Sequence, residues 1–126
     1  MNVVSGSSYL IVATGRSGER LALTSTGLAL HHQRQHRHAM TTTDAFHRYR
    51  VVLRGPALQV FVDDALRLDA PEALAPRPGY PRAELAFGAS NSPEIGEALW
   101  SEVKFRAPHA TQPLRDVVLR VSEAGR

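Results

Sequence analysis

Two aromatic residues and two arginines are the side chains of this sequence best suited to bind a ligand. Phe61 and Trp100 fall on the side of their expected strands opposite the aliphatic residues, as do Arg48 and Arg50. Because side chains alternate between the two faces of a strand, this side is expected to face outward. An exposed aromatic ring can stack on a sugar ring while arginine donates hydrogen bonds to hydroxyl groups. The simpler alternative is that a loop or a neighbouring domain covers both aromatics as a second core.

Four histidines gather in one polar, basic stretch, HHQRQHRHAM, and imidazole is a common ligand of Zn²⁺ and Ni²⁺. No Asp, Glu or Cys occurs between this stretch and Asp44 to complete or orient a metal site. We therefore predict a solvated loop, no metal site and no cofactor. The histidines concerned are His31, His32, His36 and His38.

Two further pairs could carry chemistry. His47 and Tyr49 could form a general acid–base pair, but alternation turns both inward, where a histidine is usually bonded to a backbone carbonyl. Asp63 and Asp64 resemble part of a calcium site, which needs six or more oxygens from several loops. A structural role is favoured for both pairs. His47 is interpreted as a structural histidine, and Asp63 and Asp64 as a tight turn.

The composition is that of one globular domain. The chain has 126 residues with 43% hydrophobic and 21% charged residues, no cysteine and a net charge of +3. The arginines are spread along the chain, which argues against nucleic-acid binding. No apolar run approaches the roughly 20 residues that span a bilayer. The first residues lack the positive region of a signal peptide.

The elements that must position these residues are centred on Phe46–Asp69. This stretch predicts three antiparallel strands joined by turns at Gly55-Pro56 and at Asp63-Asp64. Alternation places Leu66 and Leu68 of the third strand inward. With the runs on either side, it predicts an all-β fold of eight or nine short strands.

The flanking segments are interpreted in the same way. Strands are expected over Tyr9–Ala13, within a hairpin spanning residues 20–30, over Arg82–Gly88, over Leu99–Arg106 and over Leu114–Val121. Loops are expected over His31–Asp44 and Ala70–Arg82, and a polar turn over residues 89–96. One core between two sheets should contain Tyr49, Val51, Leu53, Leu58, Val60, Val62, Leu85, Phe87, Val103 and Phe105.

Several motifs together resemble the concanavalin A-like lectin/glucanase domains, the laminin G-like jelly rolls. Phe46–Val52 is similar to their "W/F-H-x-Y-R" strand, and Val60–Asp64 to "V-x-V-Y-V-D-G". Phe87-Gly88 and Leu99–Lys104 resemble their "F-G" and "W-D-Y-V-R" strands, in the same order. Asp64 stands where the family usually has glycine, and Ser101 where aspartate is common.

The resemblance covers residues 21–106 and leaves 107–126 as a C-terminal extension of a single sandwich domain. It implies a two-sheet antiparallel jelly-roll β-sandwich that binds carbohydrate or another surface ligand outside the cytoplasm. The glucanases of the family use an E-x-D-x-x-E strand, which this sequence lacks. We therefore expect a non-catalytic, lectin-like module. The alternatives are a structural domain that pairs with another subunit, such as a homodimer, and a hydrolase with non-standard residues.

Overall fold

The structure is a computed structural model that describes residues 2–88, 96–106 and 118–122, with backbone alone for 2–6, 96–97, 102–106 and 118–122. These residues form strands and no helix. The strands are β1 (Asn2–Thr14), β2 (Gly18–Thr24), β3 (Gly27–Leu30), β4 (Arg37–Ala39), β5 (Tyr49–Arg54), β6 (Ala57–Val62), β7 (Ala65–Ala70), β8 (Ala83–Gly88), β9 (Gly96–Leu99), β10 (Glu102–Arg106) and β11 (Val118–Ser122).

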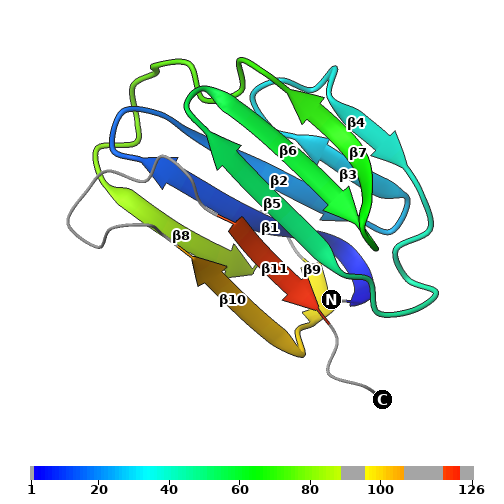
Figure 1. Cartoon of the computed structure of the whole chain (residues 1–126). Helices are drawn as coiled ribbons and strands as arrows, with labels where there is room; N and C mark the ends of the chain where they lie inside the picture. The colour runs from blue at the N-terminus through cyan, green and yellow to red at the C-terminus, as the bar shows by residue number, and fades with distance from the viewer. Residues whose placement is uncertain (1, 89–95, 107–117, 123–126) are drawn as a thin grey trace.

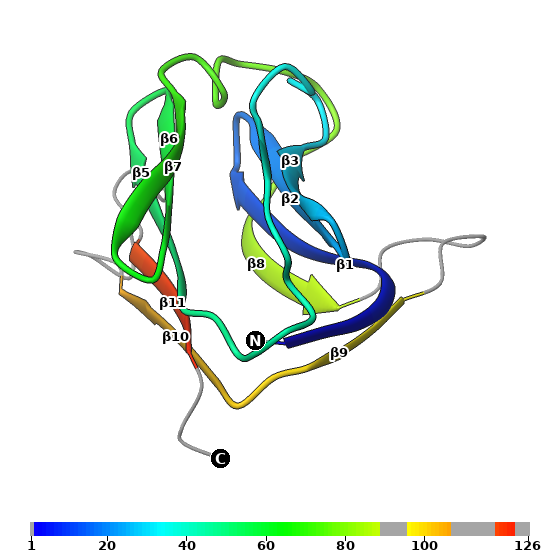
Figure 2. The same ribbon diagram turned by 90° about the vertical axis from the view of Figure 1, so that its right-hand side faces the viewer.

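The strands form two antiparallel sheets that face each other, as Figures 1 and 2 show. One sheet has the order β4-β3-β2-β1-β8, with β9 also paired to β1, and the other has the order β10-β11-β5-β6-β7. The predicted all-β sandwich is confirmed. Consecutive strands lie mostly in the same sheet, so the strand order does not confirm the jelly-roll topology.

β1 is the strand on which the first sheet is assembled. One of its edges pairs with β2, and the other pairs with β8 along Tyr9–Thr14 and with β9 along Asn2–Gly6. The expected strand over residues 9–13 is therefore longer than predicted. β2 and β3 form the predicted hairpin.

The predicted meander is present as β5, β6 and β7. Gly55 has a φ of 56°, the positive value that a tight two-residue hairpin loop requires of one central residue. Asp63 and Asp64 have φ values of 49° and 69°, as in a type I′ turn. The interpretation of the two aspartates as a turn is confirmed.

The core lies between the sheets and matches the prediction in the meander. Tyr49, Val51, Leu53, Leu58, Val60 and Val62 are all buried in one cluster, to which the first sheet contributes aliphatic residues such as Leu10, Leu21 and Leu23. Leu85 is partly buried against this cluster. Val103 and Phe105 lie in β10, where the structure describes only the backbone.

Two predicted core residues are exposed. Leu66 is 45% exposed because the β6–β7 register shifts by one residue: Val60 pairs with Leu68, whereas Phe61 pairs with Leu66. This bulge turns Leu66 to the outer face while Leu68 stays buried. Phe87, on the strand β8 at one end of its sheet, is 50% exposed.

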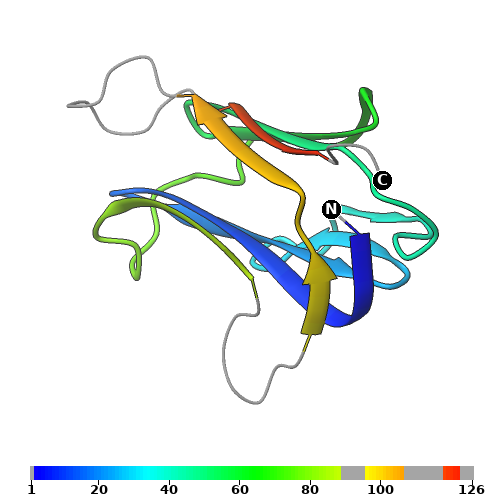
Figure 3. The ribbon, with the colours of Figure 1, turned by 90° about the horizontal axis from the view of Figure 1, so that it is seen from below.

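The other corrections concern segments outside the meander. The segment expected to be a loop at His31–Asp44 contains β4, which pairs with β3. The strand expected over Leu99–Arg106 is two strands, β9 and β10, in different sheets, and Figure 3 shows the chain crossing between the layers there. The strand expected at Leu114–Val121 is confirmed over Val118–Val121, within β11 between β10 and β5, and residues 114–117 lie outside the described residues. The turn predicted at residues 89–96 lies almost entirely outside the described residues, apart from Gly96.

Candidate ligand-binding face

The outer face of the β5–β6–β7 sheet brings together Arg50 and Phe61. The two residues are register partners on adjacent strands, on the side opposite the buried Tyr49 and Val62. The guanidinium carbon of Arg50 lies 4.2 Å from the centre of the Phe61 ring. This is a cation–π contact, which places the guanidinium over the ring.

Three neighbours of this pair complete the face. Leu66 is the register partner of Phe61, so the bulge places an exposed aliphatic side chain beside the ring. Gln59 lies on the same face, two residues before Phe61, and its side-chain nitrogen donates to Asp69 Oδ1 at 3.5 Å. We call Arg50, Phe61, Leu66, Gln59 and Asp69 the stacked-arginine face.

Sequence reasoning missed three of these residues. Gln59 lies on the same side of its strand as Phe61 by the same alternation but was not selected, and nothing in the sequence singled out Asp69. Leu66 was assigned to the core, and simple alternation could not have corrected this because the bulge changes the register without changing the composition.

Arg48 immediately precedes β5 and lies beside the face. Its Nη1 is 3.5 Å from Asp64 Oδ2, and both side chains are more than half exposed. The backbone N–H of Arg48 donates to Asp63 Oδ1 at 2.9 Å. Arg48 is therefore ion-paired with the turn, whereas Arg50 contacts the ring of Phe61.

Trp100 is not part of the face. It lies between β9 and β10, is partly buried against the core, and its ring centre is 4.8 Å from that of Phe87. The prediction that it shares an outer face with Phe61 is wrong, because the chain changes sheets at this residue. Three strand spacings separate β10 from β6, which is about 14 Å.

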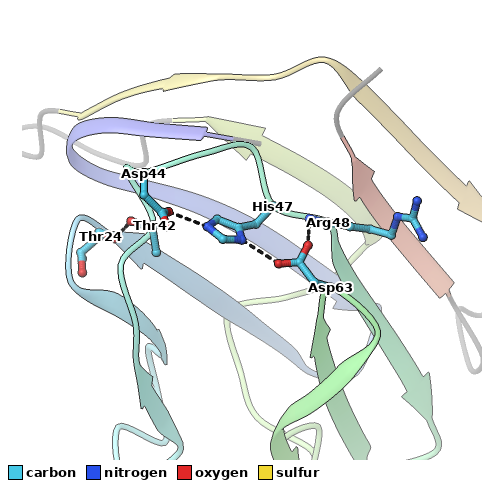
Figure 4. Close-up of polar contacts among 6 residues, drawn as sticks. All are labelled: Thr24, Thr42, Asp44, His47, Arg48 and Asp63. Atoms are coloured by element: carbon cyan, nitrogen blue, oxygen red, sulfur yellow. Dashed lines mark hydrogen bonds and ion pairs between the residues drawn. The ribbon is translucent and has the colours of Figure 1, made fainter. Parts of the chain in front are cut away.

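His47 lies close to two carboxylates at one end of the sandwich (Figure 4). Its Nδ1 is 2.7 Å from Asp63 Oδ2 and its Nε2 is 2.8 Å from Asp44 Oδ1. Asp44 belongs to the segment after β4, which Thr42 anchors through a hydrogen bond to the Thr24 carbonyl. The expectation of a bond to a backbone carbonyl is replaced by two ion pairs.

The charges of this cluster reinforce one another. Burial disfavours the charged His47 ring, but the hydrogen bonds to Asp63 and Asp44 outweigh it and raise the pKa of His47 above its ordinary 6.5. Burial tends to raise the pKa of Asp63, yet the His47 and Arg48 hydrogen bonds lower it overall. The hydrogen bond from His47 likewise lowers the pKa of Asp44.

This arrangement is poorly suited to acid–base catalysis by His47 and Tyr49. Both nitrogens of the His47 ring are bonded to carboxylates, so neither is free to take a proton from a substrate. The Tyr49 hydroxyl is buried without a hydrogen-bond partner in the described part of the chain, and burial raises its pKa. The role that fits the cluster is structural: it joins the segment after β4, through Asp44, to the β6–β7 turn, through Asp63.

The histidine-rich segment is ordered by contacts at the opposite end of the sheet. His32 donates its backbone N–H to the buried Glu19 carboxylate at 2.9 Å, and its Nε2 lies 2.7 Å from the Tyr80 hydroxyl oxygen. Burial lowers the pKa of His32 despite the nearby Glu19. Among the described residues, no three His, Cys, Asp or Glu side chains are placed to hold a metal ion.

A shallow hollow of about 490 Å³ lies over β2, β3 and β4 in the other sheet. Small residues such as Ala22, Ala29 and Ala39 line it, with Arg37 also contributing. It contains none of the predicted site residues. Over the ranges that the structure describes, no helix is long and apolar enough to cross a membrane.

Comparison of the chain with protein-family models, with curated proteins and with solved structures found no match.

Proposed function

We propose that this domain is a non-catalytic, lectin-like module that binds carbohydrate on the stacked-arginine face. The observation that carries the proposal is the 4.2 Å stack of Arg50 on Phe61, beside the Gln59–Asp69 hydrogen bond, on the outer side of a sheet. An aromatic ring edge and an exposed leucine offer apolar surface to the C–H groups of a sugar. The amide and the carboxylate offer a donor and acceptors to its hydroxyl groups.

The carboxylates near this face favour binding over hydrolysis. Glycoside hydrolysis needs two carboxyl groups flanking the scissile bond. Here Asp69 is bonded to Gln59, and Asp64 is paired with Arg48. Each acid therefore already has a hydrogen-bond or ion-pair partner within the domain.

A glycan array and titration with the whole domain test the proposal. Phe61→Ala should abolish binding while leaving the melting temperature within a few degrees, because Phe61 lies on the outer face. Phe87→Ala is the matched control, since it removes a half-exposed phenylalanine from the other sheet and should leave binding unchanged.

Two results would contradict the proposal. One is the absence of any saccharide binding at millimolar concentration. The other is a solution mass of a dimer in which Phe61→Ala restores the monomer, since the face would then be a subunit interface. That second outcome is the structural alternative, a homodimer formed through this sheet.

A further inference from the structure

The arginines on the outer side of β5 differ in whether a charge offsets them. Arg48 is ion-paired with Asp64, as described above. Arg50 forms no ion pair with any described residue, and its buried Nε has no hydrogen-bond acceptor there. The contact that defines its position is the ring of Phe61.

A guanidinium in this position is prepared to bind an anion. It keeps its charge at any physiological pH, and the contact with the ring restricts its position without using its N–H donors. Those donors lie in the plane of the group as a fork that matches the two oxygens of a carboxylate. Because the fork is fixed before the ligand arrives, little side-chain entropy is lost on binding.

Among the described residues, no acidic side chain forms an ion pair with Arg50. The Asp69 carboxylate is hydrogen-bonded to Gln59, and Asp64 is engaged by Arg48. Arg54, at the other end of the β5 outer row, is exposed and adds a second positive charge. A neutral sugar would bring no opposite charge to Arg50, whereas a carboxylate would.

We infer that the saccharide bound by this face carries a carboxylate, as uronic acids do, and that Arg50 binds this carboxylate. The inference rests on the proposed function and specifies its ligand. The carboxylate binds in the plane of the Arg50 guanidinium. The sugar ring then reaches the edge of Phe61 and Leu66. On its other side it reaches Gln59, two residues before Phe61 in β6, and the Gln59 partner Asp69.

The experiment compares two probes, polygalacturonate oligosaccharides and their methyl esters, in which esterification removes the negative charge and adds one methyl group. Wild type should bind the acid at least about tenfold more tightly than the ester, because a charge-assisted pair is lost. Arg50→Gln should weaken binding of the acid by a similar factor and bring it to the level of the ester. Arg48→Gln, which removes an already paired arginine, should change affinity by less than about twofold.

Arg50→Lys separates charge from geometry. It keeps the positive charge but lacks the planar fork, so it should recover only part of the affinity. Thermal melts of all variants check that each one is folded at the temperature of the binding assay. If Arg50→Gln is unstable, Arg50→Lys replaces it in the comparison.

Each contrary outcome has its own meaning. If acid and ester bind equally and Arg50→Gln changes neither, the proposal that Arg50 binds a carboxylate is wrong. The proposed carbohydrate function is then still supported. Arg50-dependent binding of a single-stranded DNA oligonucleotide, with no binding of either saccharide, overturns both the acidic saccharide and the carbohydrate function. Binding of none of the three probes overturns both as well.

Discussion

His47 and Asp63 are joined across the end of the sandwich by an Nδ1–Oδ2 contact of 2.7 Å. The same aspartate accepts the Arg48 backbone N–H, and its own N–H donates to the Arg48 carbonyl. The β6–β7 turn is thus fastened to the start of β5. Through its Nε2 contact with Asp44, His47 also ties in the segment that links the two sheets.

The first prediction is that this cluster makes stability depend on pH. The pKa of His47 is raised, so its contribution is complete below 6.5 and is lost as pH rises through the raised value. The pKa values of Asp44 and Asp63 are lowered from 3.8, so their contribution is complete above that pH and is lost as pH falls further. The cluster should therefore stabilise most between pH 3.8 and 6.5.

Melting temperatures from pH 4 to pH 9 check this. His47→Gln should melt below wild type at pH 5, and the difference should shrink towards pH 9. His36→Gln is the control, since that ring forms no ion pair with a described residue. A constant gap between His47→Gln and wild type at every pH would rule out the proposed charge dependence.

The second prediction uses the two left-handed aspartates. Asp64→Gly should stabilise the domain by about 1 kcal/mol, because glycine adopts a positive φ without steric cost. Asp63→Gly should destabilise it, because the carboxylate that binds His47 and the Arg48 N–H is lost. Urea unfolding of the two variants measures both signs, and a loss of stability in Asp64→Gly would show that its ion pair with Arg48 outweighs the backbone strain.

The third prediction contrasts two leucines of the meander. Leu53 is fully buried and Leu66 is 45% exposed. Leu53→Ala should cost about 2–4 kcal/mol of unfolding free energy, whereas Leu66→Ala should stay within about 0.5 kcal/mol. Similar losses for both would mean that the bulge in β7 is absent and that Leu66 points inward.

A fourth prediction concerns Gly18 and Tyr80. A Cβ added to Gly18 would lie 2.3 Å from the Tyr80 ring, which also bonds to His32. Gly18→Ala should therefore displace the ring and cost about 1–3 kcal/mol. In the Gly18→Ala, Tyr80→Ala double variant the two losses should not add. Additive losses would place the ring elsewhere.

The fifth prediction assigns Trp100 to stability rather than to ligand binding. Trp100→Ala should lower the unfolding free energy by up to about 3 kcal/mol, because the ring packs on Phe87 and against the core. Saccharide affinity measured well below the melting temperature should stay the same. A variant that melts normally but loses binding would return Trp100 to the ligand site.

The sequence predicted what depends on local alternation. The meander, its two turns and its buried face follow from period two and from turn residues. Alternation failed at Leu66 and at Trp100, where a bulge and a change of sheet interrupt the period. Alternation also could not find the ion pairs of His47, since Asp44 and Asp63 meet the ring only through tertiary structure.

The position of β11 has a consequence for the order in which the sandwich is completed during synthesis. β10 pairs with β11, and β11 with β5, whereas no ladder joins β10 directly to β5. A growing chain that ends before Val118 therefore has β10 without this neighbour and the Arg50 edge of the meander open. An unpaired strand edge of this kind can pair with other chains. When β11 emerges, it covers the open edges of β10 and β5 at once.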